Sequence, residues 1–223
     1  MAKKRVGVVL SGCGFLDGTE IHEAVLTLLS LDQRGAEILC MAPNTDQMHV
    51  VDHTESAPAE GEGRNVLKES ARIARCEITD MATVQAADLD ALVFPGGFGA
   101  AKNLCTFATQ GPACSVNSDV DRLIKALHRA GKPLGFICIA PAIAAKVLGE
   151  LGPKLTIGND ADTAGALEAL GATHVDCPVD EFVADERLKI ASTPAYMLGP
   201  SVAHVAQGID KLIEQVLAWA QEC

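Results

Sequence analysis

The residues with the clearest chemical potential in this 223-residue chain lie in the stretch Gly131–Pro141. The apolar run Leu134–Ile137 is typical of a short buried strand, and Cys138 stands where that run stops. Pro141 suits the first turn of a helix, because its missing N–H group is not needed there. A strand that ends in a thiol and turns directly into a helix predicts a nucleophile elbow, with Cys in the position usual for Ser.

The position of Cys138 before a helix predicts a reactive thiol. The free N–H groups and the dipole of the following helix favour thiolate over thiol, so we expect a pKa below the usual value of about 8.5. The alternative is a buried structural cysteine at a strand end, because free Cys is among the most buried residue types. The local pattern leaves both interpretations open.

A glycine-rich turn, Pro95–Gly99, follows the apolar run Ala91–Phe94. Glycines after a strand let backbone N–H groups face a ligand at the carboxyl edge of a sheet, where open α/β folds bind their ligands. We expect the N–H groups of Gly97 and Ile139 to stabilise an oxyanion there. The alternative is an ordinary tight turn between a strand and a helix.

A proton partner for the thiol is expected in the first turn of a helix that runs to about Arg34, where Glu20, His22 and Glu23 lie. A carboxyl group beside a thiolate would be held protonated and could donate a hydrogen bond to sulfur. The alternative for Glu23 is a solvated surface acid, because it points away from the apolar stripe of that helix. The six histidines show no metal-ligand spacing, so no metal site is expected, and His22 is a possible site residue.

Strand and helix signals alternate along almost the whole chain. This alternation predicts a mostly parallel, doubly wound sheet with right-handed crossovers. A small β-hairpin near the C-terminus is also expected. The expected strands cover 5–10, 37–41, 91–94, 134–137 and 154–157, the hairpin 182–192, and the helices 17–34, 65–75, 119–130, 161–170 and 201–221. An Asp17–Glu20 capping box is expected to begin the first helix.

Composition limits the classes of partner. A formal net charge of −11 repels phosphate backbones and anionic lipid, so we expect neither nucleic acid nor a membrane as partner. The apolar run Val6–Leu10 is too short for a signal peptide, and no run approaches the roughly 20 apolar residues of a membrane span. The eight cysteines, at 13, 40, 76, 105, 114, 138, 177 and 223, form no CxxC pair, which favours reduced thiols in a cytoplasmic protein.

Two other features bear on ligands. The glycines after the first and third expected strands do not complete a GxGxxG fingerprint, and the second strand ends without an acid for a ribose, so no nucleotide cofactor is expected. The polar, turn-rich segment 44–64 is long for a compact domain. We expect it to be a functional or interface element.

Together these residues resemble the PfpI and Parkinson-associated deglycase superfamily, relatives of the class I glutamine amidotransferases. Gly135–Pro141 is similar to the nucleophile motif of the superfamily. The segment that begins at His22 resembles the segment that carries its partner glutamate. Pro95–Gly97 resembles its oxyanion turn. The resemblance implies one class I glutamine amidotransferase-like domain over 1–223, a three-layer flavodoxin-like sandwich and a homodimer. It also implies Glu23 rather than Glu20 as the acid, and Gly96 as a possible site residue.

Within the superfamily the chain most resembles the ElbB-like branch, proteins described as enhancing lycopene biosynthesis and as glyoxalases. The stretches that carry this resemblance are Ser11–Gly14, Asp17–Ala24, Arg64–Leu67, Pro95–Leu104, Leu155–Gly158, Thr193–Leu198 and Gly208–Leu212.

Two positions depart from the superfamily pattern. Many active members carry a His after the strand that follows the elbow helix, whereas this chain has Asn159, which is a further possible site residue. Ile139 stands where protease-like members have His. Amidase and protease chemistry are therefore disfavoured, because acyl transfer to a leaving amine needs a general acid.

The sequence thus favours a cofactor-independent glyoxalase that converts glyoxal or methylglyoxal to glycolate or lactate. Cys138 would be the nucleophile, Glu23 the proton shuttle, and a small 2-oxoaldehyde the substrate. The alternative is a non-catalytic redox-sensing or binding protein that uses the same cysteine, since an exposed thiol of low pKa suits both functions. A link to isoprenoid biosynthesis comes only from the resemblance.

Overall fold

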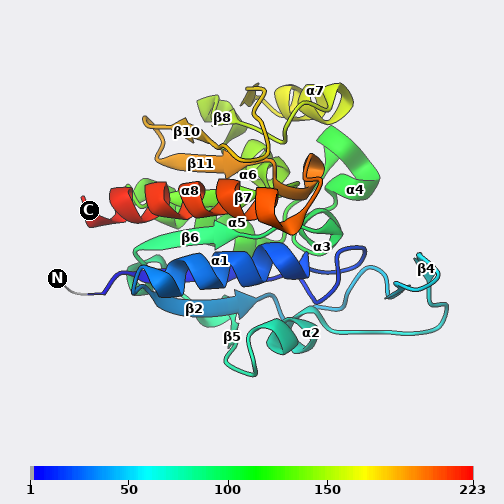
Figure 1. Ribbon diagram of the computed structural model, residues 1–223. Helices are drawn as coiled ribbons and strands as arrows, with labels where there is room; N and C mark the ends of the chain where they lie inside the picture. Colours follow the sequence, from blue (N-terminus) through cyan, green and yellow to red (C-terminus); the bar gives the residue numbers. More distant parts are fainter. Residues whose placement is uncertain (1–2, 223) are drawn as a thin grey trace.

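A seven-stranded sheet runs through the middle of the computed structural model, which describes residues 3–222 (Figure 1). Its strand order is β10-β11-β7-β6-β1-β2-β5. All neighbouring strands are parallel except the β10–β11 hairpin. The strands are β1 (Arg5–Val9), β2 (Glu37–Ala42), β5 (Thr79–Asp80), β6 (Ala91–Phe94), β7 (Leu134–Ile137), β10 (Val183–Asp185) and β11 (Ile190–Thr193). The prediction of a mostly parallel sheet with a late hairpin is confirmed.

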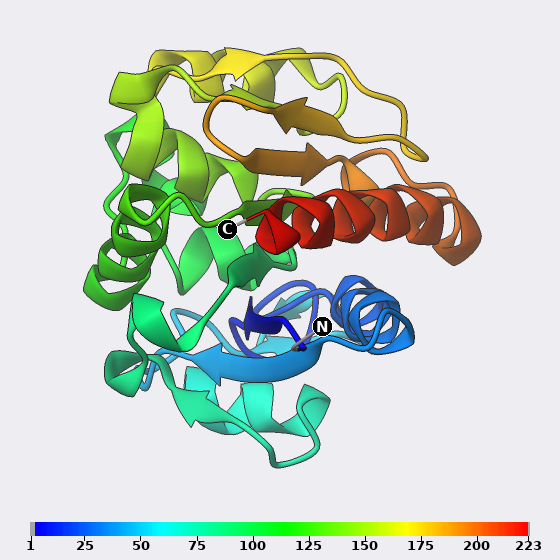
Figure 2. The same ribbon diagram turned by 90° about the vertical axis from the view of Figure 1, so that its left-hand side faces the viewer.

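Helices cover both faces of this sheet. Figure 2 shows α1 (Ile21–Gln33) and α8 (Val202–Gln221) on one face, with α5 (Ser118–Arg129) and α6 (Pro141–Leu148) on the other. The sheet separates two apolar clusters, one against each helical layer. Strands covered on both faces must be apolar on both, which explains the unbroken runs of β1, β6 and β7. The predicted three-layer flavodoxin-like sandwich is confirmed.

Shorter elements complete the fold. They are α2 (Val66–Ile73), α3 (Phe98–Lys102), α4 (Phe107–Gln110), α7 (Ala161–Ala169), the strand pairs β3 (Val51–Asp52) with β4 (Ala57–Pro58) and β8 (Lys154–Leu155) with β9 (Thr173–His174), and 3-10 turns at Met81–Thr83, Ala86–Asp88, Gly111–Ala113, Gly149–Leu151 and Ala195–Met197. No helix in the described part of the chain is long and apolar enough to cross a membrane. The seven cysteines within it are free, and Cys223 lies outside it.

A stacked aromatic pair aligns the two strands that lead to the site. Phe94 of β6 and Phe136 of β7 are register partners, and both are fully buried. Their rings are nearly parallel, with centroids 5.0 Å apart. This packing brings the carboxyl ends of β6 and β7 to the same edge, where the glycine-rich turn and Cys138 follow.

The expected strand at 154–157 is only half formed and lies outside the central sheet. Lys154–Leu155 pairs with β9 in a separate two-stranded sheet. Beyond it, the Thr156 N–H donates to Ser192 Oγ and the Ile157 N–H to His174 Nε2. Because side chains of other segments satisfy these backbone donors, the segment needs no continuous ladder.

The start of α1 also differs from the expectation. Its N-cap is Glu20, whose side chain accepts a hydrogen bond from the Glu23 N–H at 2.7 Å, so the predicted Asp17–Glu20 capping box is wrong. Asp17 is buried, and its Oδ2 accepts from the Val51 N–H at 2.8 Å. A tertiary contact with the 44–64 segment has taken the side chain that the local pattern assigned to the helix.

Candidate active site

Cys138 follows β7 directly, at the edge of the sheet where the strands end. Its φ is +61°, a conformation uncommon for a residue other than glycine. The turn Cys138–Ala140 leads into α6, which begins at Pro141, and the Cys138 N–H donates to the Thr193 carbonyl at 3.0 Å. The strand, strained turn and helix have the arrangement of a nucleophile elbow. The thiol residue is only 7% exposed.

Glu23 lies behind the thiol and is completely buried. Its Oε2 accepts a hydrogen bond from the Gly96 N–H at 2.8 Å and its Oε1 one from the Tyr196 N–H at 3.2 Å. Its carboxyl group also hydrogen-bonds the Cys138 side chain. The alternative of a solvated surface acid is therefore wrong.

The orientation of α1 explains how an acid becomes buried. The predicted apolar stripe consists of Ile21, Val25, Leu28 and Leu29, and only Leu28 packs against the core. The other three point outward and are each more than 40% exposed. The inward face consists largely of small and polar residues, Glu23, Ala24, Thr27, Ser30 and Leu31. The hydrophobic pattern alone assigned the wrong face of this helix to the core.

Burial dominates the titration of both groups. It raises the pKa of Glu23 to about 8, with the charge of Glu20 adding to the shift, against hydrogen bonds from the Tyr196 and Gly96 N–H groups. Burial and then the Glu23 charge raise the pKa of the Cys138 thiol well above its usual range. At neutral pH the pair therefore carries its protons, and the Glu23 carboxyl can donate to sulfur.

This result corrects the expectation of a thiol with a lowered pKa. The N–H groups of Gly97 and Ile139 do hydrogen-bond the Cys138 sulfur and lower its pKa. Two N–H dipoles do not compensate for the loss of water around an almost fully buried sulfur. The thiol becomes nucleophilic only when the pair loses a proton.

Neighbouring atoms lie so close to Gly96 and Gly97 that neither position has room for a side chain. A Cβ atom at Gly96 would lie 2.4 Å from Cys138 Cβ and 2.7 Å from Glu23 Oε2. Gly97 has a φ of +92°, and a Cβ there would lie 2.3 Å from the Glu20 backbone nitrogen. Glycine at both positions lets the turn fit between the thiol, the buried acid and the start of α1.

A cavity of about 710 Å³, which we call the site cavity, opens over Cys138. It is mostly apolar. Its described lining residues are Phe15, Glu20, His22, Gly97, Phe98, Cys138, Ile139, Thr163, Tyr196 and Met197.

Some of the predicted site residues line the site cavity or contact the thiol, and one lies away from it. His22 lines the cavity, with its Nδ1 2.8 Å from the Tyr196 hydroxyl. Glu23 contacts the thiol from behind, with Gly96 packed against both. Asn159 is exposed and does not line the cavity.

Sequence reasoning missed the role of Tyr196, which connects β11 to the site. Its backbone N–H donates a hydrogen bond to Glu23 Oε1, and its hydroxyl forms a hydrogen bond with His22 Nδ1. It follows Ala195, whose φ is +44°, in the turn after β11. The available signal was the Thr193–Leu198 segment, which helps carry the family resemblance and directly follows the predicted hairpin.

The 44–64 segment reaches the site through the loop before α1. In that loop Asp17 Oδ2 accepts a hydrogen bond from the Val51 N–H, and the Leu16 N–H donates one to His53 Nε2 at 3.3 Å. The His53 ring contacts Phe15 edge-on, with centroids 5.5 Å apart. The segment therefore supports one wall of the site cavity.

Comparisons with known proteins decide the family. No protein-family model matches the chain. It is 51% identical over 222 residues to the human glutamine amidotransferase-like class 1 domain-containing protein 3, mitochondrial, covering 96% of this chain and 82% of that protein. It is 49% identical over 224 residues to the rat ES1 protein homolog, mitochondrial, with 96% and 84% covered. The chain belongs to the glutamine amidotransferase-like class 1 (ES1) family.

Solved structures agree with this membership. An isoprenoid biosynthesis protein with an amidotransferase-like domain from Ehrlichia chaffeensis is 37% identical, with a TM-score of 0.90 over 97% of this chain and 99% of that one. Glyoxalase III from Candida albicans, 17% identical with 97% of each chain covered, has a TM-score of 0.62 and shows the shared fold alone. The superfamily resemblance inferred from the motifs is thereby supported at the level of the family and the fold.

The relatives correct one prediction. The human, rat and zebrafish proteins are all described as mitochondrial, the last being 36% identical over 230 residues, with 95% of this chain and 84% of that protein covered. The prediction of a cytoplasmic protein is therefore wrong. Composition could not reveal this, because charge and cysteine spacing do not separate one reducing compartment from another.

This ES1-family protein does not present the histidine that acyl transfer to an amine requires. Among the described lining residues the histidine is His22, which is paired with Tyr196. His174, the histidine nearest in sequence to the expected position, has a side chain only 5% exposed and accepts from the Ile157 N–H. The site therefore fits amidotransferase chemistry poorly, despite the family name.

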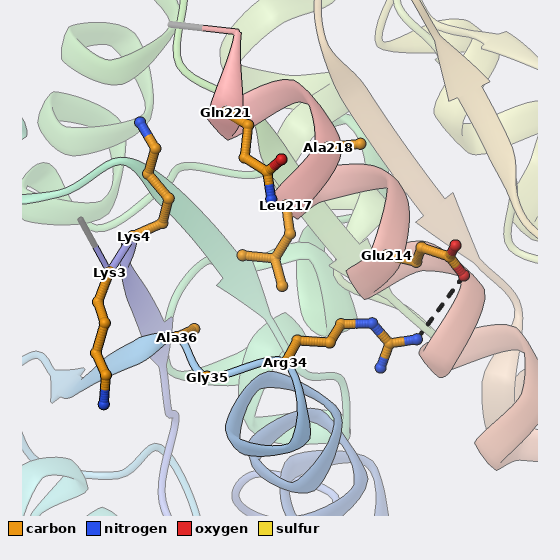
Figure 3. A pocket seen from close by; sticks show the side chains of 9 residues that line it. All are labelled: Lys3, Lys4, Arg34, Gly35, Ala36, Glu214, Leu217, Ala218 and Gln221. Atoms are coloured by element: carbon orange, nitrogen blue, oxygen red, sulfur yellow. Dashed lines mark ion pairs between the residues drawn. The ribbon is translucent and has the colours of Figure 1, made fainter. Parts of the chain in front are cut away.

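A second hollow of about 800 Å³ lies at the opposite end of the sheet (Figure 3). We call it the amino-end hollow, because Lys3 and Lys4 precede β1 and Ala36 precedes β2. Figure 3 shows Arg34 reaching toward Glu214 across its rim, at 3.8 Å. Its described lining residues are Lys3, Lys4, Arg34, Gly35, Ala36, Glu214, Leu217, Ala218 and Gln221.

Proposed function

We propose that this ES1-family protein is a cofactor-independent glyoxalase that converts a 2-oxoaldehyde to a 2-hydroxy acid. The observation that carries the proposal is the buried pair of Cys138 and Glu23 beneath the site cavity, with two N–H groups on the sulfur. Such a pair can form a covalent adduct and move one proton. No leaving amine has to be protonated.

In the first step the Cys138 sulfur adds to the aldehyde carbon. A C–S bond forms, the C=O π bond breaks, and the thiol proton ends on the former aldehyde oxygen, which gives a hemithioacetal. In this proposal the N–H groups of Gly97 and Ile139, which hydrogen-bond the Cys138 sulfur, would also stabilise the developing oxyanion. A bound substrate that displaces water from the mostly apolar cavity would strengthen these hydrogen bonds.

In the second step a proton moves between adjacent carbons. Glu23, as carboxylate, removes the proton from the hemithioacetal carbon and returns one to the neighbouring carbon. The hydroxyl proton of the hemithioacetal passes to the oxygen of that neighbouring carbon, which leaves a thioester of the hydroxy acid. Water then hydrolyses the thioester and restores the thiol. One aldehyde carbon is oxidised and the adjacent ketone carbon is reduced, so no external oxidant or reductant is needed. A carboxyl with a pKa of about 8 is a stronger base than an ordinary glutamate.

The second candidate is a non-catalytic redox-sensing or binding protein linked to isoprenoid biosynthesis. The description of the Ehrlichia chaffeensis protein favours the isoprenoid link. The raised pKa and low exposure of Cys138 speak against peroxide sensing, which needs an accessible thiolate. None of the described cavity-lining residues is Lys or Arg, so a prenyl diphosphate would find no counter-charge.

The deciding experiment measures methylglyoxal consumption and lactate formation. The wild type is compared with Cys138→Ala and Glu23→Gln, and with Arg34→Ala in the amino-end hollow as matched control. We expect Cys138→Ala to fall to background and Glu23→Gln to lose at least about a hundredfold. Circular dichroism verifies that each variant is folded.

Arg34→Ala should retain wild-type turnover. A wild type that forms no lactate above the Cys138→Ala background would eliminate the enzyme proposal. Mass spectrometry after mild peroxide treatment would then test the sensor: oxidation of Cys138 before the other cysteines supports it.

A further inference from the structure

We propose that the natural substrate carries an aromatic or branched apolar group beside its aldehyde, and no anionic group. The inference rests on the proposed glyoxalase function and names its substrate class. It follows from the size, the aromatic walls and the charge of the site cavity, each of which differs from what a three-carbon aldehyde needs.

The size of the cavity exceeds that of a small 2-oxoaldehyde. Cavities of roughly 300–1,000 Å³ typically enclose ligands of drug size, and this one measures about 710 Å³. Methylglyoxal bound to Cys138 would leave most of that space to water. Water in the cavity would weaken the oxyanion hydrogen bonds and compete with the proton shift. A larger apolar substituent would displace it.

Two aromatic rings form part of the cavity wall while remaining largely solvent-accessible. Phe15 and Phe98 are each 47% exposed, whereas the strand residues Phe94 and Phe136 are fully buried in the core. A half-exposed aromatic ring at the mouth of a cavity is favourable surface for an apolar ligand. Ile139, Tyr196 and Met197 extend the apolar wall.

Both rings are held in place before any ligand arrives. The Phe98 N–H donates to the Phe15 carbonyl at 2.7 Å. Lys102 lies over the Phe98 ring, with Nζ 5.1 Å from the centroid, and donates to the Leu16 carbonyl. The His53 ring supports Phe15 from the 44–64 segment. A wall fixed in this way binds an apolar group without an ordering cost.

The charge of the cavity disfavours an anionic substituent. Glu20 is the acidic lining residue, and the described lining contains neither Lys nor Arg. The chain has a net charge of −11. Lys102, which lies over the Phe98 ring, donates to the Leu16 carbonyl and is not among the lining residues. A carboxylate or phosphate on the substrate would therefore be desolvated beside Glu20 without a cationic lining residue. An uncharged group avoids this cost.

The first test compares initial rates with methylglyoxal, phenylglyoxal and 4-carboxyphenylglyoxal. We expect kcat/KM for phenylglyoxal to exceed that for methylglyoxal by at least about tenfold, as burial of a phenyl ring allows. The carboxyl derivative should lose at least about tenfold against phenylglyoxal. An equal or lower value for phenylglyoxal than for methylglyoxal, or no loss with the carboxyl derivative, would overturn the inference.

Variants separate the cavity's preference from the intrinsic reactivity of each aldehyde. Phe15→Ala should reduce the ratio of kcat/KM for phenylglyoxal to that for methylglyoxal by about tenfold. Phe98→Leu, a milder change, should reduce it by about threefold. Leu151→Ala, an apolar residue that is 41% exposed outside the cavity, is the matched control and should keep the wild-type ratio. A ratio that neither phenylalanine variant changes contradicts the proposal.

A binding test keeps this inference separate from the glyoxalase proposal. Acetophenone, acetone and benzoate are titrated into Cys138→Ala, with ligand-observed NMR as readout. Acetophenone should bind at least about tenfold more tightly than acetone and benzoate, and lose this advantage in Cys138→Ala/Phe15→Ala. If no aldehyde is turned over but acetophenone keeps its preference, the glyoxalase proposal fails and the ligand class stands. If acetophenone binds no better than acetone, the inference fails whatever the turnover.

Discussion

The site cavity and the amino-end hollow have similar volumes, about 710 and 800 Å³, but very different electrostatics. In the amino-end hollow Lys4 and Arg34 are partly exposed and form ordinary ion pairs. Arg34 lies 2.6 Å from Asp210, with side chains 26% and 47% exposed, and Lys4 lies 3.7 Å from Asp90. Exposed pairs of this kind contribute about 0–1 kcal/mol each to stability.

Beneath the site cavity, by contrast, an acid and a thiol are enclosed together. Glu23 is fully buried and Cys138 nearly so, and burial raises the pKa of both. Such burial is unfavourable for folding, and groups with strongly perturbed pKa values concentrate at functional sites. The environment of the titratable groups, and not the size of a hollow, therefore distinguishes the candidate site from the amino-end hollow.

The largest contrast between the two regions is expected from glycine-to-alanine substitutions. Gly96→Ala puts a methyl group 2.4 Å from Cys138 Cβ, so we expect loss of turnover and a destabilisation of about 1–3 kcal/mol. Gly35 in the amino-end hollow has a φ of +70°, but no atom lies within 4 Å of the place that a methyl group would take there. Gly35→Ala should cost about 1 kcal/mol through backbone strain and keep full turnover.

Turnover assays and denaturant titrations of both variants check this pair. Wild-type activity in a folded Gly96→Ala protein would show that the contact among Cys138, Glu23 and the glycine turn is not needed. Equal loss of activity in Gly35→Ala would remove the distinction between the two regions.

The pH dependence of turnover gives the next largest effect. Because Glu23 has a pKa of about 8 and the thiol a higher one, the resting pair must lose a proton before it reacts. We expect kcat/KM to rise roughly fiftyfold between pH 6 and pH 8 and to level off above it. A profile measured with Arg34→Ala should coincide with that of the wild type. An activity that is constant from pH 6 to pH 8 would contradict the raised pKa values.

The smallest of these effects is on stability. Folding raises the pKa of Glu23 from 4.5 to about 8, so the folded state keeps a proton that the unfolded state releases between these values. The stabilisation of the folded state by this retained proton is complete below pH 4.5 and is lost as the pH rises toward 8. Relative to Glu23→Gln, the wild type should therefore lose about 2 kcal/mol of unfolding free energy between pH 6 and pH 8.

Urea titrations at several pH values measure this difference, and the slope is the readout, because Gln also alters hydrogen bonds to the Gly96 and Tyr196 N–H groups. Asp210→Asn, a change at an exposed ion pair, serves as control and should show no slope in this range. Parallel pH curves for wild type and Glu23→Gln would show that Glu23 is ionised in the folded protein at neutral pH.

Much of the fold could be predicted because its signals are local. β6 and β7 begin and end where their apolar runs do, and the turns at Gly97 and Cys138 follow from the residues next to them. The carboxyl ends of parallel strands meet at one edge, so the approach of Gly97, Ile139 and Cys138 was predictable as well. The catalytic roles of these residues stay predictions, as does the homodimer.

The sequence-based predictions were wrong where a side chain forms its hydrogen bonds with a segment distant in the chain. The apolar residues of α1 predicted a buried stripe, but the helix turns Glu23 inward because its carboxyl oxygens receive N–H groups from Gly96 and from Tyr196, the latter 173 residues away. Asp17 left the helix cap for Val51 in the same way. No window of local sequence contains both partners of these hydrogen bonds.

The sequence by itself determined the order of strands and helices, the thiol at a strand end and the glycines beside it, because hydrophobic period and turn chemistry act over a few residues. Only the tertiary structure decided that Glu23 is enclosed with Cys138, that both pKa values rise, and that Phe15, Phe98 and Tyr196 line the cavity over the thiol. Desolvation depends on everything packed around a group, and that environment is assembled from across the chain.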